Sequence, residues 1–258
     1  MDLVFRYFVR LSFKGTEYHG WQTQGNAVSV QQTLCEKFTI FLKEKIAITG
    51  AGRTDTGVHA RNYIAHFDSV KNEIDSDDFV FRINRFLPDD IVIHEIVKVP
   101  ADAHSRFDAV SRTYKYFLNR VKDPFRKDIS YYYSGPLDIN AMNMAADILS
   151  EYNDFSSFSK AGSDTKNNLC SIKEANWTDE GDMFVFTITA DRFLRNMVRA
   201  ITGSLLEVGS KKIEPENIRT IVKSKNRSDA GTSVPAHGLF LVKIEYPETI
   251  VKFRYSSG

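Results

Sequence analysis

Cysteine is scarce in this chain of 258 residues: there are only two, Cys35 and Cys170, and they lie far apart in the sequence. Two distant cysteines cannot build a disulfide framework and are typical of a reducing compartment, so we expect a cytoplasmic protein. The six histidines are scattered and combine with the cysteines in no zinc-binding spacing. We therefore expect no metal site and no fold that depends on disulfides.

Long apolar runs are also missing, because Arg, Asp or Lys interrupts each of them before it reaches the length of a membrane span. The first residues, MDLVFRYFVRLSF, contain Asp2 and two arginines, which predicts a strand rather than a signal peptide. A strong net charge is absent as well, since 34 Lys and Arg against 33 Asp and Glu leave only +1. Proteins that bind nucleic acid are usually markedly basic overall, but basic residues can still concentrate on one surface. Composition alone therefore leaves a nucleic-acid partner open.

The sequence does contain an alternation of strand-like and helix-like segments that occurs in both halves. In the first half, the expected segments are strand 3–13, helix 30–45 with Ser29 as its N-cap, strand 62–70, helix 75–87 and strand 90–99. In the second half, they are strand 111–120, helix 137–152, strand 182–190, helices 192–209 and 214–225, and strand 237–247. We therefore expect an α+β fold of two similar sheet-plus-helix domains, residues 1–105 and 106–258, with a cleft between them.

The glycine-rich stretch ITGAGRTDTGVHA places Arg53 and Asp55 two positions apart. A phosphate-binding P-loop is excluded, because Val58 and His59 stand where Lys and Ser or Thr are needed. Two interpretations remain on residue types alone. Asp55 caps the backbone amides of an ordinary turn, or it serves as a nucleophile or general base that Arg53 keeps ionised. Spacing does not choose between them.

Several motifs taken together favour the catalytic interpretation of Asp55. In chain order they are GTEYHGWQTQ, SVQQTLCEKF, GAGRTDTGVHA, HSRFDAVSRTYKYFL, DFSSF, RFLRNMVRAITGSLLEVG and AGTSVPAHGLFLVKIEYP. In content and order they resemble the tRNA pseudouridine synthase A family over nearly the whole chain. The resemblance implies a basic active-site cleft between the two domains and an isomerase that forms pseudouridine in the anticodon stem-loop of tRNA, at the family's positions 38, 39 and 40. It also implies a homodimer that handles tRNA across both subunits. The reaction involves no redox change and no net hydrolysis, so we expect no cofactor.

The resemblance assigns roles to four residues. Asp55 would be the catalytic carboxylate, and Arg53 would fill the space left by the flipped nucleotide or contact phosphate. Tyr114 would pack against the target uracil and handle its C5 proton, although Tyr116 has the same strand parity and therefore the same face. Arg199 would be the ionic partner of Asp55. Taken alone, Arg53 reads as a solvated charge and Tyr114 as a strand tyrosine.

A helical wheel of residues 192–209 gives an apolar arc opposite Arg192, Arg195 and Arg199, which ordinarily indicates a solvated basic face. Other residues read either as ordinary core or surface positions or as contacts to RNA, and those that bind phosphate would position the RNA without reading its sequence. These are Trp21, Gln22, Gln24, Arg61, Arg106, Arg112 and Lys160. The sequence departs from the family's usual residues at Lys14, Thr56 and Cys170.

Two rival interpretations deserve a test. One is a non-catalytic RNA-binding or RNA-folding protein that kept the cleft and lost the reaction. The other is a relative that modifies a different RNA position. The sequence does not favour an aromatic RNA-recognition module, because no strand of its Arg/Lys-Gly-Phe type appears.

Overall fold

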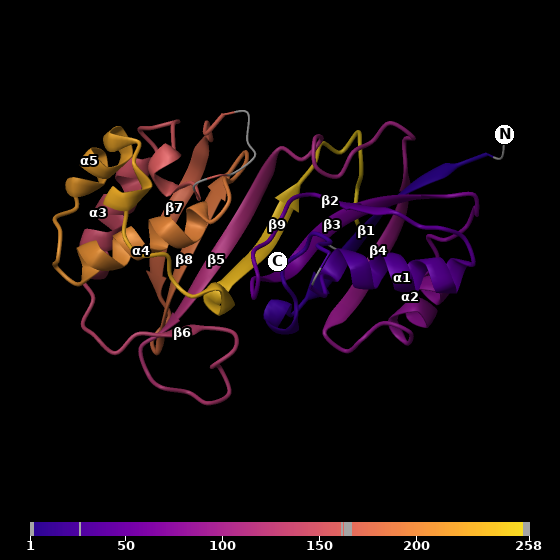
Figure 1. The fold of residues 1–258 in the computed structure, drawn as a ribbon, viewed down its shortest axis with the longest axis horizontal. Helices are drawn as coiled ribbons and strands as arrows, with labels where there is room; N and C mark the ends of the chain where they lie inside the picture. The colour runs from indigo at the N-terminus through magenta and orange to yellow at the C-terminus, as the bar shows by residue number, and fades with distance from the viewer. Residues whose placement is uncertain (1–2, 26, 161, 163–166, 255–258) are drawn as a thin grey trace. The chain divides into compact units, whose positions relative to one another are not determined.

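The computed structural model describes residues 3–25, 27–160, 162 and 167–254 (Figure 1). They group into two compact units. The first takes in the described residues of Met1–Val110 and Leu241–Gly258, and the second those of Ser111–Phe240. Strand β9 (Leu239–Glu245) begins in the second unit and ends in the first. The division into two domains at residue 105 stays a prediction.

The first unit is built on strand β1 (Phe5–Phe13), which pairs antiparallel with β3 (His59–Ser69) and with β4 (Ile91–Val99). The short strand β2 (Ile48–Gly50) adds to β3. Two helices, α1 (Val30–Leu42) and α2 (Asp77–Asn84), lie beside each other (Figure 1), and the rings of Phe41 and Phe79 meet edge to face at 5.3 Å. This packing explains why the apolar residues of both helices recur at helical spacing.

Both faces of β1 are covered. Tyr7 stacks on Phe67, which in turn contacts Phe38 of α1, so one face packs against a helix. The neighbouring residue Phe8 points to the other face and meets the ring of Tyr246 at 5.4 Å. The sequence of β1 alternates apolar residues with Arg6, Arg10 and Ser12, and it departs from this alternation only at Phe8.

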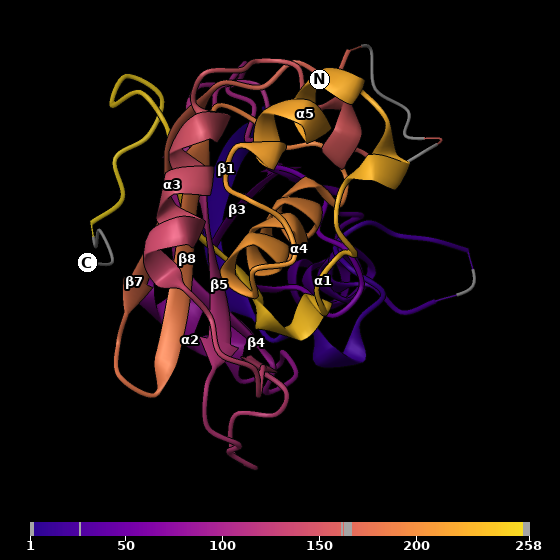
Figure 2. The same cartoon turned by 90° about the vertical axis from the view of Figure 1, so that its left-hand side faces the viewer.

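The second unit is built on strand β5 (Ser111–Asn119), which pairs antiparallel with β8 (Met183–Ala190). β8 pairs with β7 (Ile172–Asp179), and the two-residue strand β6 (Tyr131–Tyr132) runs parallel to β5. Helices α3 (Ile139–Leu149), α4 (Met197–Gly209) and α5 (Asn217–Ser224) cluster together, and α3 packs against both β7 and α4 (Figure 2). Short 3-10 turns occupy Gly15–Glu17, Ser156–Phe158, Arg227–Asp229 and Ala236–Gly238.

The α+β fold class is confirmed, and so is the N-cap of α1, where Ser29 Oγ accepts a hydrogen bond from the Gln32 amide at 3.2 Å. Strand β7 was not predicted. Its sequence, IKEANWTD, is rich in polar residues that strands disfavour, and half of its positions are exposed. None of the helices within the described residues is long and apolar enough to cross a membrane.

The predicted helix 192–209 is wrong in its first turn. Helix α4 begins only at Met197, because Asn196 adopts a left-handed backbone conformation with φ of 66°. Arg192 and Arg195 therefore precede the helix, and the expected basic helical face does not exist. The helix itself is buried on nearly all sides.

Candidate active site

Asp55 lies on the loop that connects β2 to β3, next to Arg53. The Asp55 side chain is half-buried and that of Arg53 is exposed. The Val58 amide donates to the Asp55 carbonyl at 3.1 Å, and Gly57 adopts φ of 79°, so a tight turn follows the aspartate immediately. The turn gives Asp55 a defined backbone conformation at the start of a long, buried strand.

A second segment of the same unit holds this loop from the side. The Trp21 amide donates to the Thr54 carbonyl at 3.4 Å, and the Gly57 amide donates to the Tyr18 carbonyl at 3.3 Å. At Gly20 the two backbones come so close that a Cβ would lie 2.3 Å from the Thr54 carbonyl oxygen, and Gly20 has φ of 85°. Only glycine combines that approach with that conformation.

Aromatic residues support both segments. Trp21 is buried and stacks on Tyr63 with ring centroids 4.1 Å apart, and the Tyr63 hydroxyl donates to the Gly52 carbonyl. The Tyr18 hydroxyl donates to the Asp90 carboxylate at 2.6 Å. Trp21 is therefore a core residue, and Tyr18, Gly20 and Tyr63, which the sequence analysis did not single out, hold the Asp55 loop.

The structure separates the two tyrosines of β5. Tyr116 is fully buried and donates its hydroxyl to the Pro235 carbonyl at 2.9 Å, and burial raises the pKa of Tyr116. Tyr114 is half-buried, and its ring meets the edge of Phe193 at 5.1 Å. Because Tyr116 is committed to the interior, Tyr114 is the better candidate for contact with a base.

Arg199 lies in the first turn of α4 and is half-buried. Its Nε–H donates to the Val234 carbonyl at 2.7 Å, and the Val234 amide donates to the Arg199 carbonyl at 3.2 Å. The segment around Thr232 packs so closely on α4 that a Cβ on Gly203 would lie 1.9 Å from the Thr232 carbonyl oxygen. This contact explains a glycine in the middle of a helix, where it is otherwise unfavourable.

The candidate residues divide between the two units. Arg53 and Asp55 belong to the first, and Tyr114 and Arg199 to the second. The pairing of Arg199 with Asp55 stays a prediction. Of the weaker candidates, Arg112 donates to the Asp191 carbonyl at 2.7 Å. The exposed ones are Gln22, Gln24, Arg61, Arg106 and Lys160.

Cys170, one of the departures from the family's usual residues, is buried, and desolvation raises the pKa of its thiol to about 12. The thiol therefore stays neutral and supplies no charge to an RNA. Among the described residues, no group of three or more His, Cys, Asp or Glu side chains is placed to hold a metal ion.

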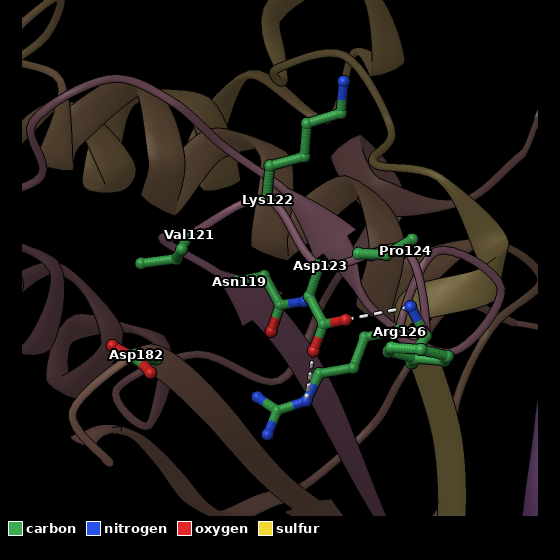
Figure 3. Close-up of a pocket in the computed structure, with 8 residues that line it drawn as sticks. Asn119, Val121, Lys122, Asp123, Pro124, Arg126 and Asp182 are labelled. Carbon is green, nitrogen blue, oxygen red and sulfur yellow. Dashed lines mark hydrogen bonds and ion pairs between the residues drawn. The ribbon is translucent and has the colours of Figure 1, made fainter.

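A hollow of about 240 Å³ lies in the second unit, beside the loop that follows β5 (Figure 3). Its lining includes Asp123, whose carboxylate accepts from the Phe125 amide and pairs with Arg126 at 3.2 Å. None of the four candidate site residues lines this hollow. The hollow and the candidate site therefore have no lining residue in common.

His66 lies on β3 and is buried beside Ser105. Its Nδ1 accepts from the Ser105 amide at 3.2 Å and lies 2.8 Å from Ser105 Oγ. Desolvation, and then the charges of His104 and Arg6, lower the pKa of His66 to about 4. Ser105 is fully buried, so the Ser–His pair is no exposed nucleophile. It fastens the chain near residue 105 to β3.

This histidine gives a pH prediction. The folded-state pKa of about 4 lies below the unfolded value of about 6.5, so between these pH values the unfolded chain binds the extra proton. The free energy of unfolding should therefore fall by about 3 kcal/mol from pH 6.5 to 4 on account of His66. Urea unfolding followed by Trp fluorescence should show a flatter pH dependence for His66→Asn than for the unsubstituted protein. An unchanged slope in His66→Asn would contradict the assignment.

Residues 148–247 match the family model described as tRNA pseudouridine synthase. The chain is 50% identical over 248 residues to the tRNA pseudouridine synthase A of Bacteroides fragilis, a match that covers 96% of this chain and 98% of that protein. The protein of the same name from Parabacteroides distasonis is 51% identical over 248 residues, with 95% and 97% covered. The Clostridium acetobutylicum protein is 42% identical over 238 residues, with 92% and 97% covered.

Proposed function

Because the chain belongs to the tRNA pseudouridine synthase A family, it is an isomerase that acts on tRNA, and we propose that it isomerises uridines of the anticodon stem-loop with Asp55 as its catalytic carboxylate. The observation that carries the role of Asp55 is the clamp around its loop. Backbone hydrogen bonds with the Tyr18 carbonyl and the Trp21 amide, and the close approach at Gly20, fix the residues on both sides of this carboxylate. A reacting group held in one geometry lowers the barrier through orientation.

The reaction breaks the N-glycosidic bond of a uridine, turns the base and joins its C5 to C1′ of the ribose. The target base must first leave its stack, which costs a few kcal/mol that contacts with the protein must offset. Attack at C6, attack at C1′ and assistance to glycal formation each require Asp55 to be ionised. A guanidinium close to a carboxylate favours the ionised form, and we assign this role to Arg199.

The remaining roles follow from residue chemistry. Tyr114 offers an aromatic face for the uracil and a phenolic hydroxyl for proton transfer. Arg53 is a planar cation on an exposed loop, able to stack on bases or to pair with phosphate. A homodimer that handles tRNA across both subunits completes the proposal.

Incubation with unmodified tRNA that carries tritium at C5 of its uracils tests the function. Tritium must leave when C5 becomes the glycosidic carbon, so we expect its release together with pseudouridine in the anticodon stem-loop. Binding without release would favour the non-catalytic rival. Release from uridines elsewhere in the tRNA would overturn the proposed position while leaving the chemistry intact.

Arg199→Ala tests the electrostatic role. Loss of a charge that stabilises the reacting carboxylate should lower kcat by about 10²-fold. Affinity for tRNA, to which many phosphate contacts contribute, should change by less than about threefold. Single-turnover tritium release and filter binding at one fixed salt concentration separate the two quantities. A parallel loss of both would mean that Arg199 only binds RNA.

A further inference from the structure

The hydroxyl of Ser233 joins two side chains that have no role in the scheme above. Ser233 Oγ lies 2.6 Å from Asn196 Nδ2 and 2.8 Å from Arg227 Nη2. The amide nitrogen and the guanidinium nitrogen can only donate, so the oxygen accepts both hydrogen bonds with its two lone pairs. One small side chain thus ties the residue before α4 to the turn after α5.

Asn196 controls where α4 begins. It is the N-cap residue and has the left-handed conformation, which asparagine tolerates better than most residues but which still needs support from its surroundings. The hydrogen bond to Ser233 supplies that support. Arg199 follows within the first helical turn, so the geometry at Asn196 sets the direction from which the Arg199 side chain starts.

Arg227 holds the segment that follows α5 and leads to Ser233. Besides Ser233, its guanidinium donates through Nη1 to the Ala230 carbonyl at 3.1 Å and to the Gly231 carbonyl at 3.2 Å. Three hydrogen bonds from one planar group hold the shape of this short segment. Val234, the residue after Ser233, carries the carbonyl that accepts the hydrogen bond from the Arg199 Nε–H.

We propose that Arg227, Ser233 and Asn196 are positioning residues for Arg199. They hold the start of α4 and the Val234 carbonyl in register, so that the Arg199 Nε–H stays bonded and the plane of its guanidinium is fixed. A preorganised charge stabilises a reacting group without reorganising during the reaction. The inference rests on the proposed role of Arg199 and extends it to three residues outside the reacting centre.

Ser233→Ala is the variant that tests this network, because it removes both hydrogen bonds and leaves the backbone unchanged. In protein labelled with ¹⁵N-arginine, the Arg199 Nε–H signal is identified by its disappearance in Arg199→Lys. We expect hydrogen exchange at this Nε–H to accelerate by about tenfold or more, as for a loosened hydrogen bond. We also expect kcat to fall about tenfold at nearly constant tRNA affinity. Ser228→Ala, an exposed serine of the same turn, is the control and should change neither quantity.

The two readouts separate the two ways of failing. Unchanged exchange at Arg199 Nε–H would overturn the positioning role, whatever the activity. Faster exchange with unchanged kcat would instead overturn the role of Arg199 in the reaction. If Ser233→Ala does not fold, Asn196→Gly permits the same left-handed backbone and removes the side chain that donates to Ser233, and it is judged by the same two criteria.

Discussion

Asn in place of Asp55 is expected to stop pseudouridine formation while tRNA still binds. The substitution keeps the shape of the side chain and removes its negative charge, and an amide is neither a nucleophile nor a base at neutral pH. The clamp around the loop consists of backbone hydrogen bonds to the Thr54 carbonyl and from the Gly57 amide, so it does not depend on the carboxylate. We therefore expect a fall in kcat of about 10³-fold or more, in the range that loss of a covalent catalyst produces.

Single-turnover tritium release with excess enzyme measures the chemical step of the Asp55→Asn variant, and filter binding at constant salt measures its affinity for tRNA. Asp89→Asn is the matched control, because Asp89 is exposed in the same unit and its loss changes the net charge equally. The control should retain full turnover. More than about a tenth of the original activity in Asp55→Asn would remove the carboxylate from the mechanism.

Local patterns predict most elements of this fold, for reasons that act within a few residues. Ser29 and the apolar positions of α1 are close neighbours in the sequence, so their pattern identifies the helix and its cap. The start of α4 is different. The helical periodicity of the sequence extends to residues before Asn196. A hydrogen bond from Asn196 to Ser233, 37 residues away, favours the left-handed backbone conformation that prevents the helix from starting earlier. Tertiary contacts of this kind override local preference.

The candidate site also contains some residues that the sequence identifies and others that only the folded chain reveals. Asp55, Arg53, Tyr114 and Arg199 lie within motifs that the sequence displays openly. The residues that hold Asp55 cannot be identified from the sequence, because their partners are remote. Tyr18 donates a hydrogen bond to Asp90, 72 residues away, and Gly20 is required by its close approach to the backbone of Thr54. A glycine in a loop is ordinarily read as a turn, and only the folded chain shows that Gly20 is a point of contact.

Alanine at Gly20 is accordingly the second substitution with a large expected effect. A Cβ at this position would lie 2.3 Å from the Thr54 carbonyl oxygen, a separation that forces one backbone to move. The moving residue is either Gly20 or the neighbour of Asp55. The φ of 85° adds strain, because a residue other than glycine is less stable in the left-handed region by about 1–2 kcal/mol.

We expect Gly20→Ala to lower kcat by about 10²-fold, because a displacement of about 1 Å in a reacting group has that effect. The midpoint of thermal unfolding should fall as well. Gly25→Ala is the matched control: it lies in the same loop with no neighbouring atom within 4 Å of the added Cβ, so it should fold and turn over normally. If Gly20→Ala lost stability but kept its turnover per folded molecule, the contact would serve the fold alone. A loss of turnover larger than the loss of folded protein would instead mean that the approach of Gly20 to Thr54 places Asp55 for the reaction.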